Sequence, residues 1–498
     1  MRTYLGVDIG AESGRVVAGR WDGRRLGLEV VHRFGNGPLR MGGALRWDLP
    51  GLWEGVRRGL GLASRLGPVA SVGVDTWALD YVLTGRDGEM LEPAYCYRDG
   101  RTRGMVGELE SRLGRSRVFG ETGVQFMEIN TLCQWMAHAR DGSGALERAT
   151  AMWMVPDWLN WRLSGERSCE FTNATTTQFM DPARRDWARG LLRDLGLPTH
   201  ALAAPSASGT RLGPLRREIG EDTGLGAVPV VLPATHDTAS AVVGVPTSGT
   251  GRAGWGYISS GTWSLVGIET GAPVMGEAAL AANVTNEGGH AGTWRVLKNV
   301  MGLWLVQRCR AALGAGGEEL SYESMVESAR AAMPWRSLVD PDDAGFLMPD
   351  DMATALRGAC ARTGQPVPGT AGELVRCCLE SLALKYARTV RVLEALSGER
   401  IEVLHVVGGG SRNGLLNQLT ADATGCRVVA GPVEATVLGN ILVQMEADGQ
   451  VTGMAGMRGV GATVEALREH EPETSGREAA QEAMERWERM FGAHGGAR

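Results

Sequence analysis

Two segments of the chain share one pattern of apolar and polar positions. Residues 5–18 run through an apolar stretch, a turn that contains Gly10, and a second apolar stretch. Residues 257–266 repeat that order around Gly261. β-branched residues on both sides of a short Gly- and Ser/Thr-containing turn predict an antiparallel pair of strands. The sequence therefore predicts two similar hairpins, with Gly10 and Gly261 lying 251 positions apart in a chain of 498 residues.

The turns of these hairpins suggest a chemical role. Glycine and small hydroxyl residues let backbone N–H groups approach an anion without steric obstruction. A single turn of this kind usually only reverses the chain. Two copies half a chain apart instead predict duplicated domains that face a shared cleft and hold one polyphosphate between them. The chain is thus a candidate ATP-using enzyme.

The rest of the pattern predicts an α/β protein. A helix opened by Asp48 and Pro50, and another ended by Gly425, carry recognisable start and stop signals. The strands are expected at 4–9, 14–20, 27–33, 69–75, 80–84, 228–233 and 402–407, with a second hairpin at 257–268. The helices are expected at 50–66, within 130–165, after residue 234, and at 298–312, 370–396 and 411–424, with a helix and frayed tail in 465–498.

The chain is too long for one hydrophobic core, so two large domains are expected. The segment 245–254, rich in Gly, Ser and Thr, is a plausible connection between them. We expect an N-terminal domain at 1–246, a C-terminal domain at 252–455, and a terminal helix and tail at 456–498.

Composition excludes several classes of protein. A net charge of −6 argues against a nucleic-acid surface or an anionic-membrane patch. The first strand begins by Tyr4 and no apolar run could span a bilayer, so we expect a cytoplasmic protein without a signal peptide. The eight cysteines form no Cys-x-x-Cys pair, which argues against a zinc or redox motif. The oligomeric state is not readable from these features.

Both common phosphate-binding loops are absent. The chain has only two lysines, Lys298 and Lys385, and neither follows a glycine, which excludes a Walker A loop. Asn413 stands where a dinucleotide fingerprint beginning at Gly408 would need its third glycine. Any nucleotide must therefore bind in another cradle.

Three further segments could carry chemistry. Thr235–Ala239 follows a buried strand, so either Asp237 or Thr238 is a helix N-cap, or Asp237 is a reactive carboxylate at a strand end. Gly408–Gly410 would let a flat ligand lie against the backbone, whereas a simple strand-to-helix turn explains only one of its glycines. Asp75–Asp80 offers two carboxylates and an indole suited to a sugar, or else a core tryptophan with two strand-end acids.

Taken in order, these segments resemble the FGGY carbohydrate kinases, of the actin, hexokinase and heat-shock chaperone superfamily, and within them the subfamily that acts on L-rhamnulose. The resemblance extends from about residue 4 to residue 450. It is carried by residues 7–15, 47–48, 75–77, 97–99, 173–178, 236–241, 259–264, 283–289, 297–304, 407–410 and 431–435.

The resemblance implies an α/β fold of two ribonuclease H-like (actin-like ATPase) domains flanking a deep cleft. It also implies ATP-dependent, Mg²⁺-assisted phosphorylation of L-rhamnulose at O1, with Asp237 as the catalytic base. The ATP contacts carried over by position are Ala11, Glu12, Ser13, Gly14, Arg15, Thr262, Gln307 and Gly409. The sugar contacts are Ala78, His236, Asp237, Thr238 and Asn299, and Asp8 is the expected Mg²⁺ ligand.

Two positions depart from the subfamily pattern. Ala78 replaces a usual glycine, which allows a tighter sugar pocket, and Glu12 replaces a smaller residue in the first phosphate turn. Because a carboxylate repels phosphate, we expect Glu12 to point into solvent.

Other classes are weighed against this one. An actin-like or chaperone-like ATPase would share the hairpins but leave the sugar-type motifs unexplained. A sugar-responsive regulator would begin with a basic helix-turn-helix, whereas this chain begins with the phosphate hairpin. A kinase of the same family acting on fuculose, xylulose or glycerol differs only in hydroxyl recognition.

Overall fold

The computed structural model describes residues 1–251, 254–314 and 320–492. The chain forms two compact units that interleave in sequence. Unit 1 comprises Met1–Gly251, Thr270–Val296 and Glu434–Glu465, and unit 2 comprises Arg252–Glu269, Leu297–Val433 and Ala466–Arg498. The expected domains were continuous in sequence, whereas 434–465 groups with unit 1. Of the expected connection 245–254, residues 252–253 lie outside the described residues.

Unit 1 is built on a six-stranded sheet of order β11-β12-β6-β1-β2-β3. Unit 1 as a whole contains, inside and outside this sheet, the strands β1 (Arg2–Ile9), β2 (Ser13–Trp21), β3 (Leu26–Gly35), β4 (Pro38–Met41), β5 (Ala44–Trp47), β6 (Val69–Thr76), β7 (Tyr81–Thr84), β8 (Ala151–Met154), β9 (Met180–Asp181), β10 (Asp186–Trp187), β11 (Arg211–Pro214), β12 (Pro229–Val231) and β15 (Thr285–Gly288). Its helices are α1 (Leu49–Ala63), α2 (Met105–Leu113), α3 (Arg115–Thr122), α4 (Thr131–Arg140), α5 (Ala145–Arg148), α6 (Val155–Ser164), α7 (Phe171–Ala174), α8 (Arg189–Asp194), α9 (Arg217–Thr223), α10 (Asp237–Val243), α11 (Glu277–Ala282), α17 (Ala435–Ala447) and α18 (Gly453–Gly461).

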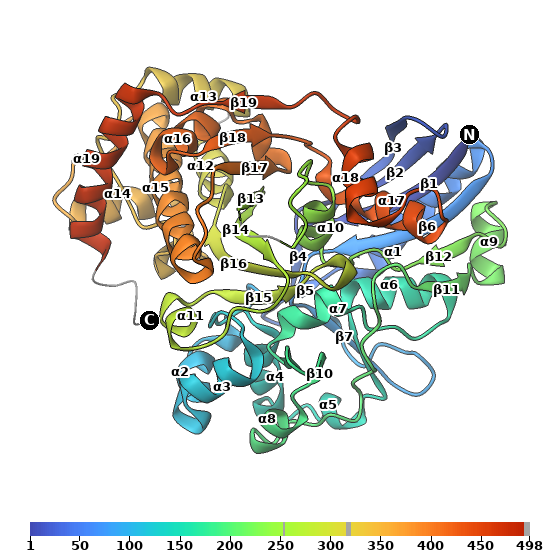
Figure 1. Ribbon diagram of the computed structural model, residues 1–498. Helices are drawn as coiled ribbons and strands as arrows, with labels where there is room; N and C mark the ends of the chain where they lie inside the picture. Colours follow the sequence, from blue (N-terminus) through green and yellow to red (C-terminus); the bar gives the residue numbers. More distant parts are fainter. Residues whose placement is uncertain (252–253, 315–319, 493–498) are drawn as a thin grey trace. The chain divides into compact units, whose positions relative to one another are not determined.

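Helices cover both faces of the unit 1 sheet. Figure 1 shows α17 and α18 beside β1 and β6, and the apolar side of α17 packs on β1, β2 and β6. Glycine permits this close contact, because a Cβ at Gly6 would lie 2.5 Å from a methyl carbon of Val437. On the other face a Cβ at Gly59 of α1 would lie 2.3 Å from Val16. Helix α1 starts as expected, with the Asp48 side chain accepting from Gly51 N and proline in the first turn.

The sheet of unit 2 repeats this arrangement. The strand order of this seven-stranded sheet is β15-β16-β14-β13-β17-β18-β19. Strand β13 pairs antiparallel with β14 and parallel with β17, just as β1 pairs antiparallel with β2 and parallel with β6. The strands are β13 (Trp255–Ser260), β14 (Trp263–Thr270), β16 (Trp294–Met301), β17 (Val403–Val407), β18 (Arg427–Ala430) and β19 (Arg468–His470). The helices are α12 (Trp304–Gly314), α13 (Tyr322–Ala331), α14 (Met352–Arg362), α15 (Ala371–Ser397), α16 (Gly414–Thr424) and α19 (Thr474–Phe491).

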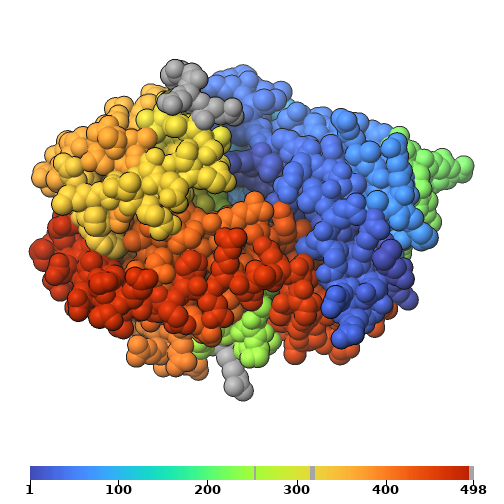
Figure 2. Space-filling model, turned by 90° about the horizontal axis from the view of Figure 1, so that it is seen from above, coloured from blue at the N-terminus to red at the C-terminus, as the bar shows by residue number. Residues whose placement is uncertain are grey.

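The C-terminal segment belongs to the core of unit 2. Trp487 of α19 is buried with Leu338 and Leu384, and its indole N–H donates to Val339 O at 2.8 Å. Figure 2 shows the red surface of this segment adjoining the yellow and orange surface of unit 2. The expected terminal helix is therefore present from Thr474 and is preceded by strand β19, while residues 493–498 of the expected tail lie outside the described chain.

The expected helix at 298–312 is wrong in its first part. Lys298–Met301 belong to strand β16, and α12 begins only at Trp304. The intervening Gly302 lies so close to β14 that an added Cβ would be 2.5 Å from Ser264 Oγ. The N–H groups of Gly302 and Trp304 both donate to Thr262 O, at 3.2 and 3.1 Å. This contact with the hairpin turn ends the strand before a helix can start.

The expected start of the helix at 411–424 is also corrected. Residues 409–412 form a short 3-10 turn, and α16 begins at Gly414. Asn413 accepts from Leu416 N at 3.0 Å and so acts as the N-cap. The end at Gly425 is as expected, in the left-handed conformation at φ 71°.

Candidate active site

Three carboxylates gather at one edge of the unit 1 sheet. Asp8 on β1 and Asp75 on β6 are paired in register near the carboxyl ends of these parallel strands. The N–H of Thr76 donates to Thr235 O at 2.9 Å, which brings the segment before α10 alongside β6. Asp237, the first residue of α10, follows directly. Carboxyl ends of parallel strands are where α/β folds place reactive groups.

Asp8 lies against the first hairpin. Its Oδ2 accepts from Arg15 Nη2 at 2.6 Å, and Arg15 Nε lies 2.9 Å from Glu434 Oε2. Burial raises the pKa of the Asp8 carboxyl, Arg15 opposes that shift, and the nearby Asp237 and Glu434 charges add to it. Asp8 is thus buried, paired with one cation and close to a second acid.

The hairpin turn that joins β1 to β2 is compact. Gly10 N donates to Ser13 O at 2.9 Å. Gly14 has no room for a side chain, because an added Cβ would lie 2.3 Å from the Phe34 ring. Ala11 is partly exposed, and Glu12 and Ser13 are exposed, as expected for the Glu12 carboxylate.

Asp75 is the most deeply buried of the three acids. Its Oδ2 accepts from Asn440 Nδ2 of α17 at 2.6 Å, while Oδ1 has no hydrogen-bond partner among the described residues. Burial, and next the Asp8 charge, raise its pKa well above the ordinary range. A cation next to these carboxylates would relieve both effects.

Asp237 differs in exposure and in the way its oxygens are engaged. Its side chain is 30% exposed. Oδ1 accepts from the N–H of Thr238 at 2.6 Å and from the Thr238 hydroxyl at 3.2 Å. Oδ2 has no partner in the described part of the chain. The cap interpretation is wrong, because the N-cap of α10 is His236 and Asp237 is the first helical residue. Thr238 holds Oδ1 of Asp237, and Oδ2 is left for a ligand.

His236 stands behind Asp237 in a buried charged group. Its Nε2 lies 3.3 Å from Asp237 Oδ1, and its Nδ1 lies 3.3 Å from Glu287 Oε2 and 3.1 Å from Arg295 Nη2. Burial lowers the pKa of His236, but the two carboxylates outweigh burial and the net pKa is raised. Burial raises the pKa of Glu287, but the Arg295 guanidinium and His236 hold it below its usual range.

The Asp75–Asp80 segment divides between site and core. Ala78, the expected sugar contact, is partly exposed. Asp80 is buried, and it accepts from the indole N–H groups of Trp47 and Trp77 at 2.5 and 3.0 Å and from Gln134 at 3.0 Å. Its oxygens are occupied by the protein, so Asp80 fixes the tryptophans instead of presenting a free carboxylate.

The remaining candidate residues lie in unit 2. Thr262 occupies the β13–β14 turn, Gln307 is on α12, and Asn299 is on β16. Gly409 is exposed, and a Cβ added there would meet no atom within 4 Å. Its neighbour Gly410 is confined, since an added Cβ would lie 1.9 Å from Ser260 Oγ. The glycine run thus places an open backbone position beside the second hairpin.

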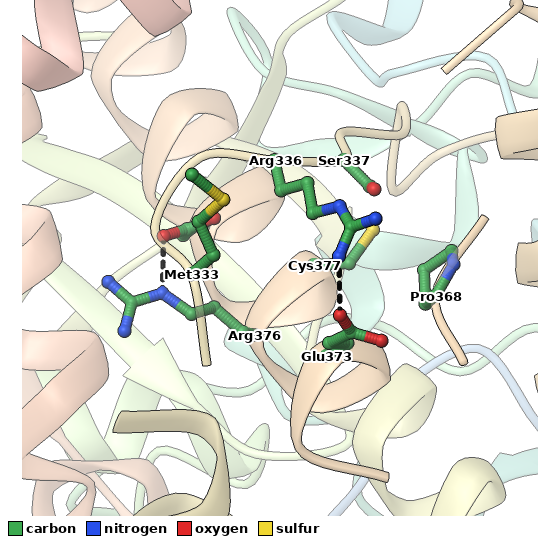
Figure 3. Close-up of a pocket in the computed structure, with 8 residues that line it drawn as sticks. Met333, Arg336, Ser337, Pro368, Glu373, Arg376 and Cys377 are labelled. Carbon is green, nitrogen blue, oxygen red and sulfur yellow. Dashed lines mark hydrogen bonds and ion pairs between the residues drawn. The ribbon is translucent and has the colours of Figure 1, made fainter. Parts of the chain in front are cut away.

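Unit 2 also contains a pocket that is formed by other residues than these candidates (Figure 3). It is lined by Met333, Arg336, Ser337, Pro368, Glu373, Arg376, Cys377 and Glu380. Its two arginines are engaged, Arg336 with Glu373 and Arg376 with Glu380, both at 2.7 Å. None of the expected site residues lines it.

Several polar residues at the site received no role from the sequence. Glu287 and Arg295 lie in or near a recognised motif, but nothing in their spacing relates them to His236. Asn440 and Glu434 come from a segment expected to belong to the other domain. The one sequence feature that could have pointed to Glu287 is an acidic residue followed by two glycines, Glu287-Gly-Gly289.

The described residues include no helix that is long and apolar enough to cross a membrane. They also hold no group of three or more His, Cys, Asp or Glu side chains arranged to bind a metal ion.

Comparison with known proteins identifies close relatives. The chain is 44% identical to a rhamnulokinase of Bacteroides thetaiotaomicron over 92% of this chain and 93% of the relative. It is 42% identical to a rhamnulokinase of Pectobacterium carotovorum over 92% of this chain and 90% of the relative. Relatives this similar along nearly the whole length share a family.

Solved structures agree on the fold. A xylulose kinase of Lactobacillus acidophilus superposes with a TM-score of 0.81 at 15% identity, covering 99% of this chain and 98% of that one. A glycerol kinase of Plasmodium falciparum, solved with ADP, superposes with a TM-score of 0.77 at 16% identity, covering 99% of this chain and 98% of that one.

The N-terminal domain of the FGGY family of carbohydrate kinases matches residues 3–244, and the C-terminal domain matches 256–447. With both family domains in order and the two-domain α/β fold of these kinases, the chain belongs to the FGGY family of carbohydrate kinases.

Proposed function

We propose that this protein transfers the γ-phosphoryl group of ATP to O1 of L-rhamnulose, giving L-rhamnulose 1-phosphate and ADP. The observation that carries the choice of sugar is the 40–44% identity with three rhamnulokinases over about 92% of the chain. The xylulose and glycerol kinases of known structure match only in fold, at 15–18% identity, so they give no comparable support for xylulose or glycerol as the substrate.

Asp237 is the proposed base. A sugar hydroxyl is a weak nucleophile, and a carboxylate within hydrogen-bond reach accepts its proton as the bond to phosphorus forms. The free Oδ2 and the partial exposure of Asp237 support this role. Because the phosphoryl transition state is loose, positioning of the hydroxyl and neutralisation of charge supply most of the rate gain.

The residues near the first hairpin fit a divalent cation. Asp8 and Asp75 would hold Mg²⁺, and water and phosphate oxygens would complete its ligands, because Mg²⁺ prefers oxygen donors and keeps part of its water. The orphan Oδ1 of Asp75 and the raised pKa values of both acids support this assignment. When bound, the ion would neutralise charge on the transferred phosphoryl group.

The nucleotide and sugar contacts are proposed on the positions carried over from the family. Residues 11–15 and Thr262, Gln307 and Gly409 bind ATP. Ala78, His236, Thr238 and Asn299 bind the sugar. The open space at Gly409 and the tight turn at Gly10–Gly14 support the phosphate and nucleotide roles.

Product analysis tests this proposal. L-Rhamnulose, ATP and Mg²⁺ are incubated with the protein, and the product is examined by ³¹P NMR with proton coupling. A phosphate on O1 couples to the two protons of the C1 methylene and gives a triplet. A doublet from a secondary carbon, or release of inorganic phosphate without a sugar phosphate, would refute the proposed reaction.

A further inference from the structure

Three buried side chains from three separate segments form a connected group behind Asp237. His236 precedes α10, Glu287 is on β15 and Arg295 is on β16. The exposed fractions of the His236, Glu287 and Arg295 side chains are 5%, 5% and 0%. Only His236 lies next to Asp237, so the other two act on the carboxylate through the imidazole.

The Nδ1 atom of His236 has two competing neighbours. Arg295 Nη2 lies 3.1 Å away and can only donate, so it needs a lone pair on Nδ1. Glu287 Oε2 lies 3.3 Å away and can only accept, so it would need a proton there. In a neutral imidazole, Arg295 therefore favours the proton on Nε2, whereas Glu287 favours the proton on Nδ1.

The geometry favours Arg295. Its Nη2 also lies 3.0 Å from Glu287 Oε2, so the guanidinium neutralises the carboxylate that competes with it. Its Nε donates to Gly288 O at 3.0 Å, which fixes the guanidinium plane. With Arg295 donating to Nδ1, the neutral imidazole carries its proton on Nε2.

We propose that Arg295 is a positioning residue that keeps the His236 proton on Nε2, where it faces the Asp237 carboxylate. Nε2 lies 3.3 Å from Asp237 Oδ1, a distance at which an N–H attracts the carboxylate and a lone pair repels it. Together with the N–H of Thr238 on the same oxygen, this holds Oδ1 and leaves Oδ2 for the sugar hydroxyl. The inference rests on the proposed role of Asp237 as the base.

The contact between Nε2–H of His236 and Asp237 is also present when the imidazole is protonated. The charged groups that face His236 are Asp237, Glu287 and Arg295. A charged imidazole carries protons on both nitrogens, with Nδ1–H turned to Glu287, and it still presents Nε2–H to Asp237. Arg295 therefore matters when His236 is neutral.

Removal of the guanidinium tests the idea. The comparison is made at a pH at which His236 is neutral in both proteins, because the Arg295 charge lowers the pKa of His236 and its loss favours the charged imidazole. In Arg295→Met the neutral His236 then has only Glu287 beside Nδ1, so its proton moves to Nδ1 and a lone pair faces Asp237. We expect kcat to fall about tenfold or more, part of the usual contribution of a general base, with the KM for ATP changed by less than about twofold.

A second substitution distinguishes this role from simple packing. In the double variant Arg295→Met/Glu287→Gln the new amide N–H₂ can donate to Nδ1 and return the proton to Nε2. We expect the double variant to recover most of the lost kcat. A merely structural role predicts that the double variant is no better than the single one, and that result would overturn the inference.

Arg458→Met is the matched control. Arg458 is also a buried arginine of unit 1, and its Nη2 donates to Val242 O at 3.2 Å, at the other end of α10. It supports the same helix without touching His236. An equal fall of kcat in both folded single variants would overturn the specific role of Arg295.

A spectroscopic measurement locates the proton directly. ¹⁵N NMR of histidine-labelled protein, with His236 assigned by His236→Asn, reports which ring nitrogen carries the proton. At a pH at which His236 is neutral, we expect Nε2–H in the parent protein and Nδ1–H in R295M. A proton on Nδ1 in the parent protein overturns the inference. A shifted proton with unchanged kcat overturns the positioning role, and the activity of D237N then decides separately whether the base assignment also fails.

Discussion

At the scale of single residues, the two oxygens of Asp237 have different surroundings. Oδ1 accepts from Thr238 and faces His236, whereas Oδ2 has no partner among the described residues. A base needs an oxygen that is open to the substrate. Oδ2 meets this requirement while Thr238 fixes the carboxylate through Oδ1.

Asp237→Asn tests the proposed base. Asparagine keeps an acceptor oxygen for Thr238 but cannot take a proton, so the local contact should remain. We expect kcat to fall by about 10²–10⁴-fold, the usual range for loss of a general base, with smaller changes in the KM for sugar and for ATP. Steady-state kinetics measure this, and thermal unfolding checks the fold. Near-normal kcat in a folded variant would exclude Asp237 as the base.

Gly409 offers a test of the nucleotide site. The protein itself has room for a side chain there, because an added Cβ meets no atom within 4 Å and Gly409 has no positive φ. We expect Gly409→Val to fold normally and to raise the KM for ATP much more than the KM for the sugar, by obstructing the nucleotide. Gly408→Val is the contrasting variant: Gly408 has φ 84° and lies close to Ser260, so this change should lower stability. An unchanged ATP KM for G409V would remove this loop from the nucleotide site.

The sequence could identify Asp8, Asp75 and Asp237 because each follows a recognisable buried strand. It could not identify the partners of these acids. Asn440 holds Asp75 from 365 positions away, and Arg295 reaches His236 from 59 positions away. Long-range pairs of this kind leave no periodic signal in one sequence, so only the folded chain reveals them.

At the scale of elements, helix α10 is positioned by α17. The two helices approach so closely that a Cβ on Gly439 would lie 1.8 Å from Ser240 O. Because α10 begins at Asp237, this contact helps to place the proposed base. The contact requires a glycine for space and not for backbone conformation, since Gly439 has no positive φ.

Gly439→Ala should therefore destabilise unit 1. The added methyl must push the helices apart, at a cost of about 1–3 kcal/mol for overpacking, and kcat should fall with the displacement of α10. Gly459→Ala is the matched control: it lies in α18, is exposed, and has nothing within 4 Å of the new Cβ. There alanine should be neutral or stabilising by up to about 1 kcal/mol. Urea unfolding of both variants measures the difference, and equal stabilities would contradict this packing argument.

Asp157 of α6 gives a pH-dependent stability. Burial, opposed by hydrogen bonds from Glu170 N and Ser168, raises its pKa to about 7. Because the folded-state pKa is raised, folding is favoured by protonation, so this contribution is full below about pH 4 and is lost as the pH rises through about 7. Asp157→Asn should remove this pH dependence. We expect the stability of D157N relative to the parent to increase between pH 4 and pH 7.5 by up to a few kcal/mol, at about 1.4 kcal/mol per pKa unit. A constant difference across that range in urea unfolding would show that Asp157 does not titrate in this way.

Helix ends and hairpin turns were predicted correctly where the local sequence restricts the backbone strongly. The Asp48 cap, the Gly425 C-cap and the hairpin turns each require particular residues at particular positions. The error at 298–301 arose because a run this short fits a strand or a helix equally well. Its strand state depends on β14 and on the contact of Gly302 with Ser264, which are tertiary features.

At the scale of the whole molecule, the duplication predicted from the two hairpins is present in the order of both sheets. The two copies differ in their chemistry. Asp8 lies two residues before Gly10 and pairs in register with Asp75, whereas Ser259 lies two residues before Gly261 and pairs with Val407. The carboxylates proposed for the metal ion therefore belong to the first copy alone. The interleaving of 434–465 with unit 1 was not predictable, because periodicity does not tell which sheet a helix covers.

The central claim, that this family member acts on L-rhamnulose, is tested most directly by a panel of acceptors. ADP release is measured by a coupled assay with L-rhamnulose, L-fuculose, D-xylulose and glycerol, each with ATP and Mg²⁺, and with D237N as the blank. We predict that kcat/KM is highest for L-rhamnulose by at least about tenfold, since misplaced hydroxyls leave polar groups of the site unpaired. A higher kcat/KM for any other acceptor, or ADP release that does not depend on an acceptor, would contradict this account.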